Sequence, residues 1–201
     1  MFSTAARLAL TAALVATASA SPAQRMSESY EFLKAVRDAN GTKVTEFLDK
    51  PGVTVINTRD QGSGETALHI VAKRGDTAYI RFLASRGANL NAQDARGNTP
   101  IMIAASAGML DCVEVLTKLR ANPNLANSSG ETPLIRAVQY RNVELTRMLL
   151  ASGANPDQRD VLAGMSARDY ATRDGRSPAI TRLLNEAPKV TTRATAGPKL
   201  R

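Results

Sequence analysis

Short blocks of apolar residues repeat along the chain with a spacing of 33 or 34 positions. Each block comes shortly after a glycine and a hydroxyl residue, and the hydroxyl group can cap the first free N–H groups of a helix. The block is about two helical turns long, so the pattern predicts a short helix at the start of each repeat. The glycines are Gly64, Gly97, Gly130 and Gly164, and the helix starts are Thr66, Thr99, Thr132 and Ser166.

A second apolar block follows each first one after a turn. Gly75, Gly108 and Gly175 stand where the first helix should close with a left-handed residue. Arg141-Asn142 stands there in the remaining repeat, and we expect Asn142 to be left-handed because asparagine tolerates this conformation better than most residues. The second helices then present the apolar faces Tyr79, Ile80 and Leu83; Cys112, Val113 and Leu116; Leu145, Met148 and Leu149; and Ile180, Leu183 and Leu184.

Two of these second helices end in the same tripeptide. Residues 87–89 and 153–155 both read Gly-Ala-Asn, whereas Arg120 takes the place of the glycine in the repeat between them. A left-handed arginine costs roughly 1–2 kcal/mol. We therefore expect a different loop shape after Arg120.

Two stretches carry a longer motif. Residues 64–75 read GETALHIVAKRG, and residues 94–105 read DARGNTPIMIAA. They resemble ankyrin repeats, and the resemblance extends over residues 26–185. It implies an all-α ankyrin-repeat solenoid of stacked helix–turn–helix units with hairpin loops, at residues 28–185. The units would be an N-terminal cap at 28–59, repeats at 60–93, 94–126 and 127–159, and a C-terminal cap at 160–185.

Residues 1–20 have the pattern of a secretory signal peptide, with one positive charge, an apolar segment and the small-residue site Ala18-Ser19-Ala20. The uncharged span between Arg7 and Arg25 is 17 residues long and contains polar residues, which is too short for a comfortable membrane-spanning helix. We expect a periplasmic or secreted protein, cut near Ala20, with residues 21–27 as a linker. A buried N-terminal helix and a mitochondrial presequence are the alternatives.

The basic charge of the chain is concentrated at its C-terminus. The formal net charge is +8, and residues 186–201 hold four basic side chains against one acidic one. This segment has two prolines, one glycine and no helical pattern, so we expect a disordered basic tail. Aromatic residues make up 4% of the chain and Trp is missing, which favours neither a nucleic-acid groove nor a deep aromatic pocket.

Side chains that usually carry catalysis or bind metals are scarce. His69 is the only histidine and Cys112 the only cysteine, so a monomer cannot assemble a usual zinc site. His69 occupies the position where ankyrin repeats carry a structural histidine, and its equivalents in this chain are Met102 and Ile135. Cys112 falls at an apolar position of the repeat, which predicts a buried core thiol.

The recurring carboxylates also have a structural explanation. Asp60, Asp94 and Asp160 stand at equivalent hairpin positions, where aspartate stabilises turns. The glycines of the repeats are accounted for by the repeat register, so we expect no Gly-rich phosphate loop. We therefore expect no enzyme activity, no cofactor and no metal.

By resemblance to the family, the hairpin tips and the exposed side of each first helix form a concave side that is free to bind a partner. Our candidates are Arg59, Glu65, Lys73, Arg74, Arg96, Asn98, Ser128, Glu131, Gln139, Tyr140, Val161, Leu162 and Arg173. Arginine and aromatic side chains dominate binding energies at interfaces, which favours Arg74, Arg96, Tyr140 and Arg173 among them.

The hairpin of the last unit differs from the others. It is one residue longer than the hairpin at 94–97, and its tip carries the apolar pair Val161 and Leu162 where the other tips are polar. An exposed apolar tip marks a contact point. The alternative is that the pair covers the end of the stack.

These observations favour a non-catalytic protein–protein interaction module. Its role would be that of an exported adapter, or of an assembly or protective factor, for a partner protein that the sequence does not identify. The alternative is association with an anionic surface, either membrane or cell wall, through the basic tail. Nucleic acid is not an expected partner.

Overall fold

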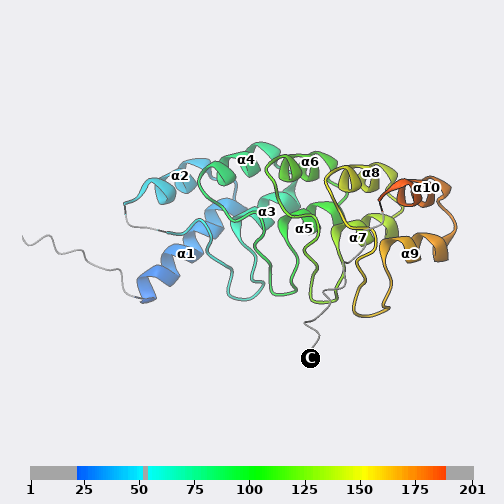
Figure 1. Cartoon of the computed structure of the whole chain (residues 1–201). Coiled ribbons are helices and arrows are strands. Elements are labelled where there is room, and N and C mark those ends of the chain that lie inside the picture. Colours follow the sequence, from blue (N-terminus) through cyan, green and yellow to red (C-terminus); the bar gives the residue numbers. More distant parts are fainter. Residues whose placement is uncertain (1–21, 52–53, 189–201) are drawn as a thin grey trace, which may run out of the picture.

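The computed structural model describes residues 22–51 and 54–188, which form ten α-helices and no strand. The helices are α1 (Pro22–Arg37), α2 (Gly41–Asp49), α3 (Ala67–Arg74), α4 (Thr77–Ser85), α5 (Pro100–Ser106), α6 (Leu110–Lys118), α7 (Pro133–Gln139), α8 (Val143–Ala151), α9 (Ala167–Asp174) and α10 (Pro178–Glu186). They follow one another as five antiparallel pairs (Figure 1). The predicted all-α solenoid is confirmed.

The helices form two layers. The even-numbered helices make one row, the odd-numbered helices make the second, and the hairpin loops project from the second row on the far side (Figure 1). Each odd-numbered helix packs on the next odd-numbered one, and α4, α6 and α8 pack on one another in the same way. We call the surface made by the hairpin loops and the exposed side of the odd-numbered helices the hairpin face.

Side-chain caps start the helices at the predicted places. The hydroxyl oxygens of Thr99, Thr132 and Ser166 accept the backbone N–H three residues later at the starts of α5, α7 and α9. Asp76 and Asn142 cap α4 and α8 in the same way with their side-chain oxygens. Each cap satisfies a backbone donor that the helix itself leaves free.

Asn142 is not the left-handed residue of its repeat, so that expectation was wrong. Arg141 has a φ of +54° instead, in register with Gly108 at +68°. Asn142 is extended and accepts the N–H of Leu145 with its side chain. The backbone N–H groups of Arg141 and Asn142 donate to carbonyls at the end of α7, in the same pattern that closes α5 at Gly108, and this turn puts the left-handed residue at 141.

Arg120 is also left-handed, with a φ of +68°, and the loop after α6 keeps the shape of its neighbours. The expectation of a different loop was therefore wrong. Ala121 is buried like Ala88 and Ala154, and side-chain oxygens of asparagines accept backbone N–H groups from the next loop. The pairs are Asn57 with Asn89, Asn91 with Asn122, and Asn124 with Asn155, at 2.7, 2.8 and 2.6 Å. These contacts offset the strain at Arg120.

One apolar core runs through the stack between the two rows of helices. Leu83, Leu149 and Cys112 are buried in it, as the sequence pattern predicted. The aromatic edge-to-face pair Phe32 and Phe47 closes the core at the N-terminal end, with ring centroids 6.2 Å apart. Short helices like these are not stable alone, so each depends on the apolar surface of its neighbours.

The two ends of the solenoid differ from the sequence expectations. α1 begins at Pro22 and includes most of residues 21–27, which we expected to be a linker. The only proline of this segment stands at the first helical position, where proline is tolerated, and the segment has no glycine, so nothing in it interrupts the helix. At the other end, α10 extends through Glu186, the first residue of the expected tail. Residues 1–20 and 189–201 lie outside the described part of the chain.

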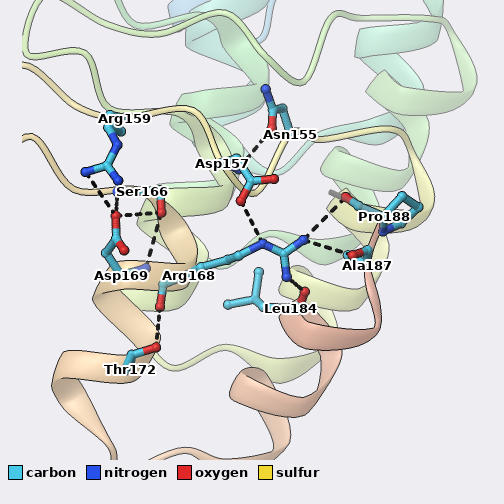
Figure 2. Close-up of polar contacts among 10 residues, drawn as sticks. All are labelled: Asn155, Asp157, Arg159, Ser166, Arg168, Asp169, Thr172, Leu184, Ala187 and Pro188. Carbon is cyan, nitrogen blue, oxygen red and sulfur yellow. Dashed lines mark hydrogen bonds and ion pairs between the residues drawn. The ribbon is translucent and has the colours of Figure 1, made fainter. Parts of the chain in front are cut away.

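Arg168 holds the C-terminal cap together (Figure 2). Its guanidinium group pairs with the Asp157 carboxylate at 2.8 Å and donates to the backbone carbonyls of Leu184, Ala187 and Pro188. The arginine therefore fixes the end of α10 to the preceding hairpin. Sequence reasoning did not find this contact because it joins residues that are far apart in the chain.

In the described part of the chain, none of the helices has the length and apolar character to cross a membrane.

We predict that Leu83→Ala or Leu149→Ala lowers the free energy of unfolding by roughly 2–5 kcal/mol, because each leaves a cavity in the core. Urea denaturation followed by circular dichroism measures the change. Arg81→Ala, on the exposed side of α4, is the matched control and should change the value by less than about 0.5 kcal/mol. Equal stability of the leucine variants and the wild type would contradict the core assignment.

We also predict that Arg120→Gly raises the free energy of unfolding by about 1 kcal/mol, since glycine adopts the left-handed conformation without steric cost. The reverse change, Gly87→Ala, should lower it by a similar amount. A Cβ at Gly87 would meet no atom within 4 Å, so only the backbone conformation is tested. The same denaturation experiment measures the free energy of unfolding of both variants. If Gly87→Ala were more stable than the wild type, left-handed strain would not explain the effect of the residue at this position.

Candidate partner-binding surface

The hairpins are built on side chains that accept backbone N–H groups. The Asp94 carboxylate accepts from Arg96 and Asn98, both at 2.8 Å, and Asn127 plays the same part in the next hairpin, with bonds of 3.0 Å to Ser129 and Glu131. Asp60 and Asp160 also accept backbone N–H groups of their own hairpins. The turn-stabilising role predicted for these aspartates is confirmed.

Neighbouring hairpins are joined to one another by backbone hydrogen bonds. The N–H groups of Ala95, Ser128 and Val161 each donate to a carbonyl of the preceding hairpin at 2.9 Å. The close approach requires glycine at Gly97, where φ is +77° and a Cβ would lie 2.7 Å from the Ser128 nitrogen. The hairpin row is therefore a continuous and well-fixed surface.

His69 connects a helix to the following hairpin and is fully buried. Its Nδ1 accepts the N–H of Thr66 at 3.1 Å, so Nε2 carries the proton and donates to the Asn98 carbonyl at 2.9 Å. Burial lowers the pKa of His69 below its ordinary 6.5. Both ring nitrogens are occupied, which confirms the structural role predicted for this histidine.

Cys112 lies in the core, and its burial raises the pKa of the thiol. It therefore stays protonated and is poorly placed as a nucleophile. Within residues 22–51 and 54–188, no group of three or more His, Cys, Asp or Glu side chains is placed to hold a metal ion.

Three of the candidate residues already serve the scaffold. Arg74 donates to the Val36 carbonyl at 2.8 Å and pairs with Asp76 at 3.2 Å. Asn98 donates to Asp94 at 3.1 Å. Glu131 pairs with the guanidinium of an arginine on α7 at 2.8 Å. These side chains connect neighbouring elements, and their polar groups are largely used inside the protein.

Four further candidates make weaker or partial contacts. Arg59 donates to the Gln93 carbonyl through one nitrogen. The Glu65 carboxylate accepts from a serine hydroxyl at 3.3 Å, and the Gln139 amide donates to a glutamate at 3.4 Å. Ser128 contributes its backbone N–H to the hairpin row, and its side chain remains exposed. These side chains keep free polar atoms on the hairpin face.

Lys73, Arg96 and Tyr140 are exposed, and none of the three has a side-chain hydrogen bond or ion pair among residues 22–51 and 54–188. Arg173 is exposed as well and stacks over the Tyr170 ring, 5.0 Å from its centroid. These four side chains are the candidates that the structure leaves available to a partner.

The apolar pair in the last hairpin projects from the molecule. Val161 is 76% exposed and Leu162 82% exposed, and the hairpin between α8 and α9 extends away from both helix rows (Figure 1). The pair therefore does not cover the end of the stack. A contact point remains the prediction for these two residues.

Charges on the hairpin face are unequally matched. Asp60 pairs with Arg37 at 2.6 Å, and the Ser63 backbone N–H and the Arg37 guanidinium hold its pKa well below the usual range. Its neighbouring hairpin carboxylate, Asp94, is buried and accepts three bonds. Lys73 and Arg96 have no such anionic partner in the described part of the chain. Lys73 and Arg96 are therefore available to an anionic group of a bound molecule, while the Glu65 carboxylate on the same face also has no ion pair among the described residues.

The structure also contains a hollow that sequence reasoning missed. A cavity of about 630 Å³ lies between α1 and the first hairpin, and Met26, Tyr30, Leu33 and Arg59 are among its lining residues. Sequence reasoning could not find it because its walls come from two separate segments of the chain, and the first of them lacks the Gly-x-Thr start from which the other helices were predicted. The early start of α1 is what forms one wall.

Comparison with known proteins identifies the family. A model of ankyrin repeats, present in three copies, matches residues 32–127 and 83–160, which together cover more than half of the chain. The chain belongs to the ankyrin-repeat family. None of the curated proteins compared with it matches. Ankyrin repeats are generally non-catalytic protein–protein interaction modules, so the family supports a protein partner for this chain.

The buried histidine of this ankyrin repeat predicts a pH dependence of stability. The pKa of His69 is lowered in the folded state. As the pH falls below about 6.5, His69 is therefore protonated in the unfolded chain while it is still neutral in the folded chain. The free energy of unfolding should then decrease by up to about 1.4 kcal/mol per pH unit. Urea denaturation between pH 7 and pH 5, roughly the histidine range, measures it.

His69→Met is the matched control, since Met102 stands at the equivalent position of the next repeat. This variant cannot gain the proton, so its stability should change little over the same pH range. Parallel pH profiles of the variant and the wild type would show that another group controls the effect.

Proposed function

We propose that this ankyrin-repeat chain is an exported, non-catalytic adapter, or an assembly or protective factor, that binds an acidic region of a partner protein through its hairpin face. The main observation behind this proposal is that some cations of this face have no bonded partner, whereas two of its carboxylates do. Lys73 and Arg96 are exposed cations without a partner among the described residues, whereas Asp60 and Asp94 are satisfied within their hairpins.

The rigidity of the face supports binding. Backbone hydrogen bonds join the hairpins, and the helices beneath them share one core. A surface that is already ordered loses little conformational entropy when a partner binds. Arg96, Tyr140 and Arg173 remain the favoured anchors, because arginine and tyrosine supply most of the energy at interfaces. Lys73 joins them in place of Arg74, whose guanidinium group is bound to Val36 and Asp76.

Export is supported by the sequence of residues 1–20 alone, which has the charge, apolar segment and small-residue site of a signal peptide. Expression of the full sequence in a Gram-negative host, followed by fractionation and intact mass measurement, tests it. We expect the protein in the periplasm or medium, with its N-terminus after Ala20. Full-length protein in the cytoplasm would overturn this part of the proposal.

Affinity capture from the fraction in which the protein is found tests the binding face. We expect a partner that co-purifies with the wild type and is lost, by about tenfold or more, with Lys73→Ala/Arg96→Ala/Arg173→Ala. The matched control Arg81→Ala/Lys118→Ala/Arg147→Ala removes three exposed cations from the even-numbered helices. Equal loss with both triple variants, or with neither, would argue against a specific hairpin face.

The alternative function is association with an anionic surface through Lys189, Arg193, Lys199 and Arg201. Sedimentation with vesicles that contain an anionic phospholipid tests it. Deletion of residues 189–201 should then abolish binding, and added salt should weaken it. The deletion begins after Pro188 because Arg168 holds Ala187 and Pro188 to the solenoid. Binding that survives the deletion would exclude the tail.

A further inference from the structure

The cavity at the N-terminal end is formed by a helix that is longer than the corresponding helices of the other repeats. α1 has 16 residues and α3 has 8, and the additional turns of α1 extend down to the level of the hairpins (Figure 1). One wall of the cavity is therefore a helix and the other is the hairpin at residues 58–62. The volume of about 630 Å³ is that of a small ligand site.

The helical wall of this cavity is mostly apolar, with Ser29 among three larger side chains. Met26 is 56% exposed and Tyr30 is 60% exposed, and both line the cavity together with the buried Leu33. Large exposed apolar side chains that gather around a hollow mark a binding site more strongly than the same residues scattered on a surface. The cavity therefore suits a bulky apolar side chain.

The opposite wall provides a cation. Asp60 is already occupied by Arg37 and by backbone N–H groups of its own hairpin. Arg59 is exposed, donates through one nitrogen to the Gln93 carbonyl, and has no ion pair among the described residues. Its remaining N–H groups are free to bind a carboxylate.

We infer that this cavity, the N-terminal pocket, receives a bulky apolar side chain from a partner segment in which an aspartate or glutamate lies next to that residue. The apolar side chain contacts Met26, Tyr30 and Leu33, and the carboxylate pairs with Arg59. Further acidic residues of the segment meet Lys73 and Arg96 along the hairpin face. The inference rests on the proposed function and specifies the chemistry of the partner.

A second copy of this chain fits the pocket less well. The exposed apolar tip at Val161 and Leu162 could enter it, but the adjacent carboxylate, Asp160, is buried and bonded to the Tyr170 hydroxyl. The tip therefore brings no free anion to Arg59. Charge complementarity favours an acidic segment from a different protein.

Phage display tests the inference. A random peptide library is selected against the full chain, which is purified after the cell has processed it. We expect the enriched peptides to share a bulky apolar residue next to Asp or Glu. Synthetic copies, labelled with a fluorophore, should bind the wild type in a fluorescence polarisation assay. Replacement of the apolar residue by Ser, or of the acidic residue by Asn or Gln, should each weaken binding by about tenfold.

Variants of the protein locate the site. Met26→Ala/Tyr30→Ala should weaken binding of the selected peptides by about tenfold or more. Both residues are exposed, so the fold should be kept, and circular dichroism checks this. Met109→Ala is the matched control, an exposed apolar residue outside the pocket, and should leave the affinity within about twofold.

Three outcomes of the peptide experiments would overturn the inference. They are a library that yields no binding peptide, enriched peptides without the apolar and acidic pair, and binding that is unchanged in Met26→Ala/Tyr30→Ala. Concentration-dependent self-association in analytical ultracentrifugation that is lost in Leu162→Asp would assign the pocket to a second copy and would also overturn it. A captured partner that requires Lys73 and Arg96 but tolerates the pocket variant would leave the proposed function intact.

Discussion

The whole structure depends on the burial of one unit against the next. None of the helices between α2 and α10 is longer than nine residues, and helices of this length do not persist in isolation. Each repeat has an apolar face that only its neighbour can cover, and the core runs unbroken from Phe32 to Leu184. Backbone bonds between hairpins and asparagine contacts between the opposite loops keep the units in register.

Much of this fold could be predicted from the sequence because the signals are local. A threonine hydroxyl that caps its own helix, or a glycine such as Gly75 that closes it, acts within a few residues and recurs at a fixed spacing. Arg120 and Arg141 could not be predicted as left-handed from their own preferences. Their conformation is imposed by the caps and buried alanines around them, which sequence propensity does not describe.

The sequence predicted which part of each repeat forms the candidate surface, but not which of its side chains are free to bind a partner. The repeat register places Lys73 and Arg74 side by side, and sequence alone favoured the arginine. In the folded chain Arg74 is bound to Val36 and Asp76, and Lys73 is the cation left to solvent. Most of the carboxylates of the face are used to fix hairpins, which leaves Lys73 and Arg96 available to an anionic group. The cavity beside α1 was invisible because its walls come from two separate segments.

The Arg168 contacts have a consequence for how the chain tolerates trimming at its C-terminus. Two of the carbonyls that accept from the guanidinium group belong to Ala187 and Pro188. A protease that stops at Pro188 leaves every one of these bonds in place, whereas removal of two more residues strips the arginine of half its acceptors, counting Asp157 and Leu184 as the others. The partly buried guanidinium group would then keep only Asp157 and the Leu184 carbonyl as acceptors, and an incompletely bonded buried charge is costly. For the stability of the solenoid, the C-terminal limit is therefore set at Pro188, within two residues of the end of α10.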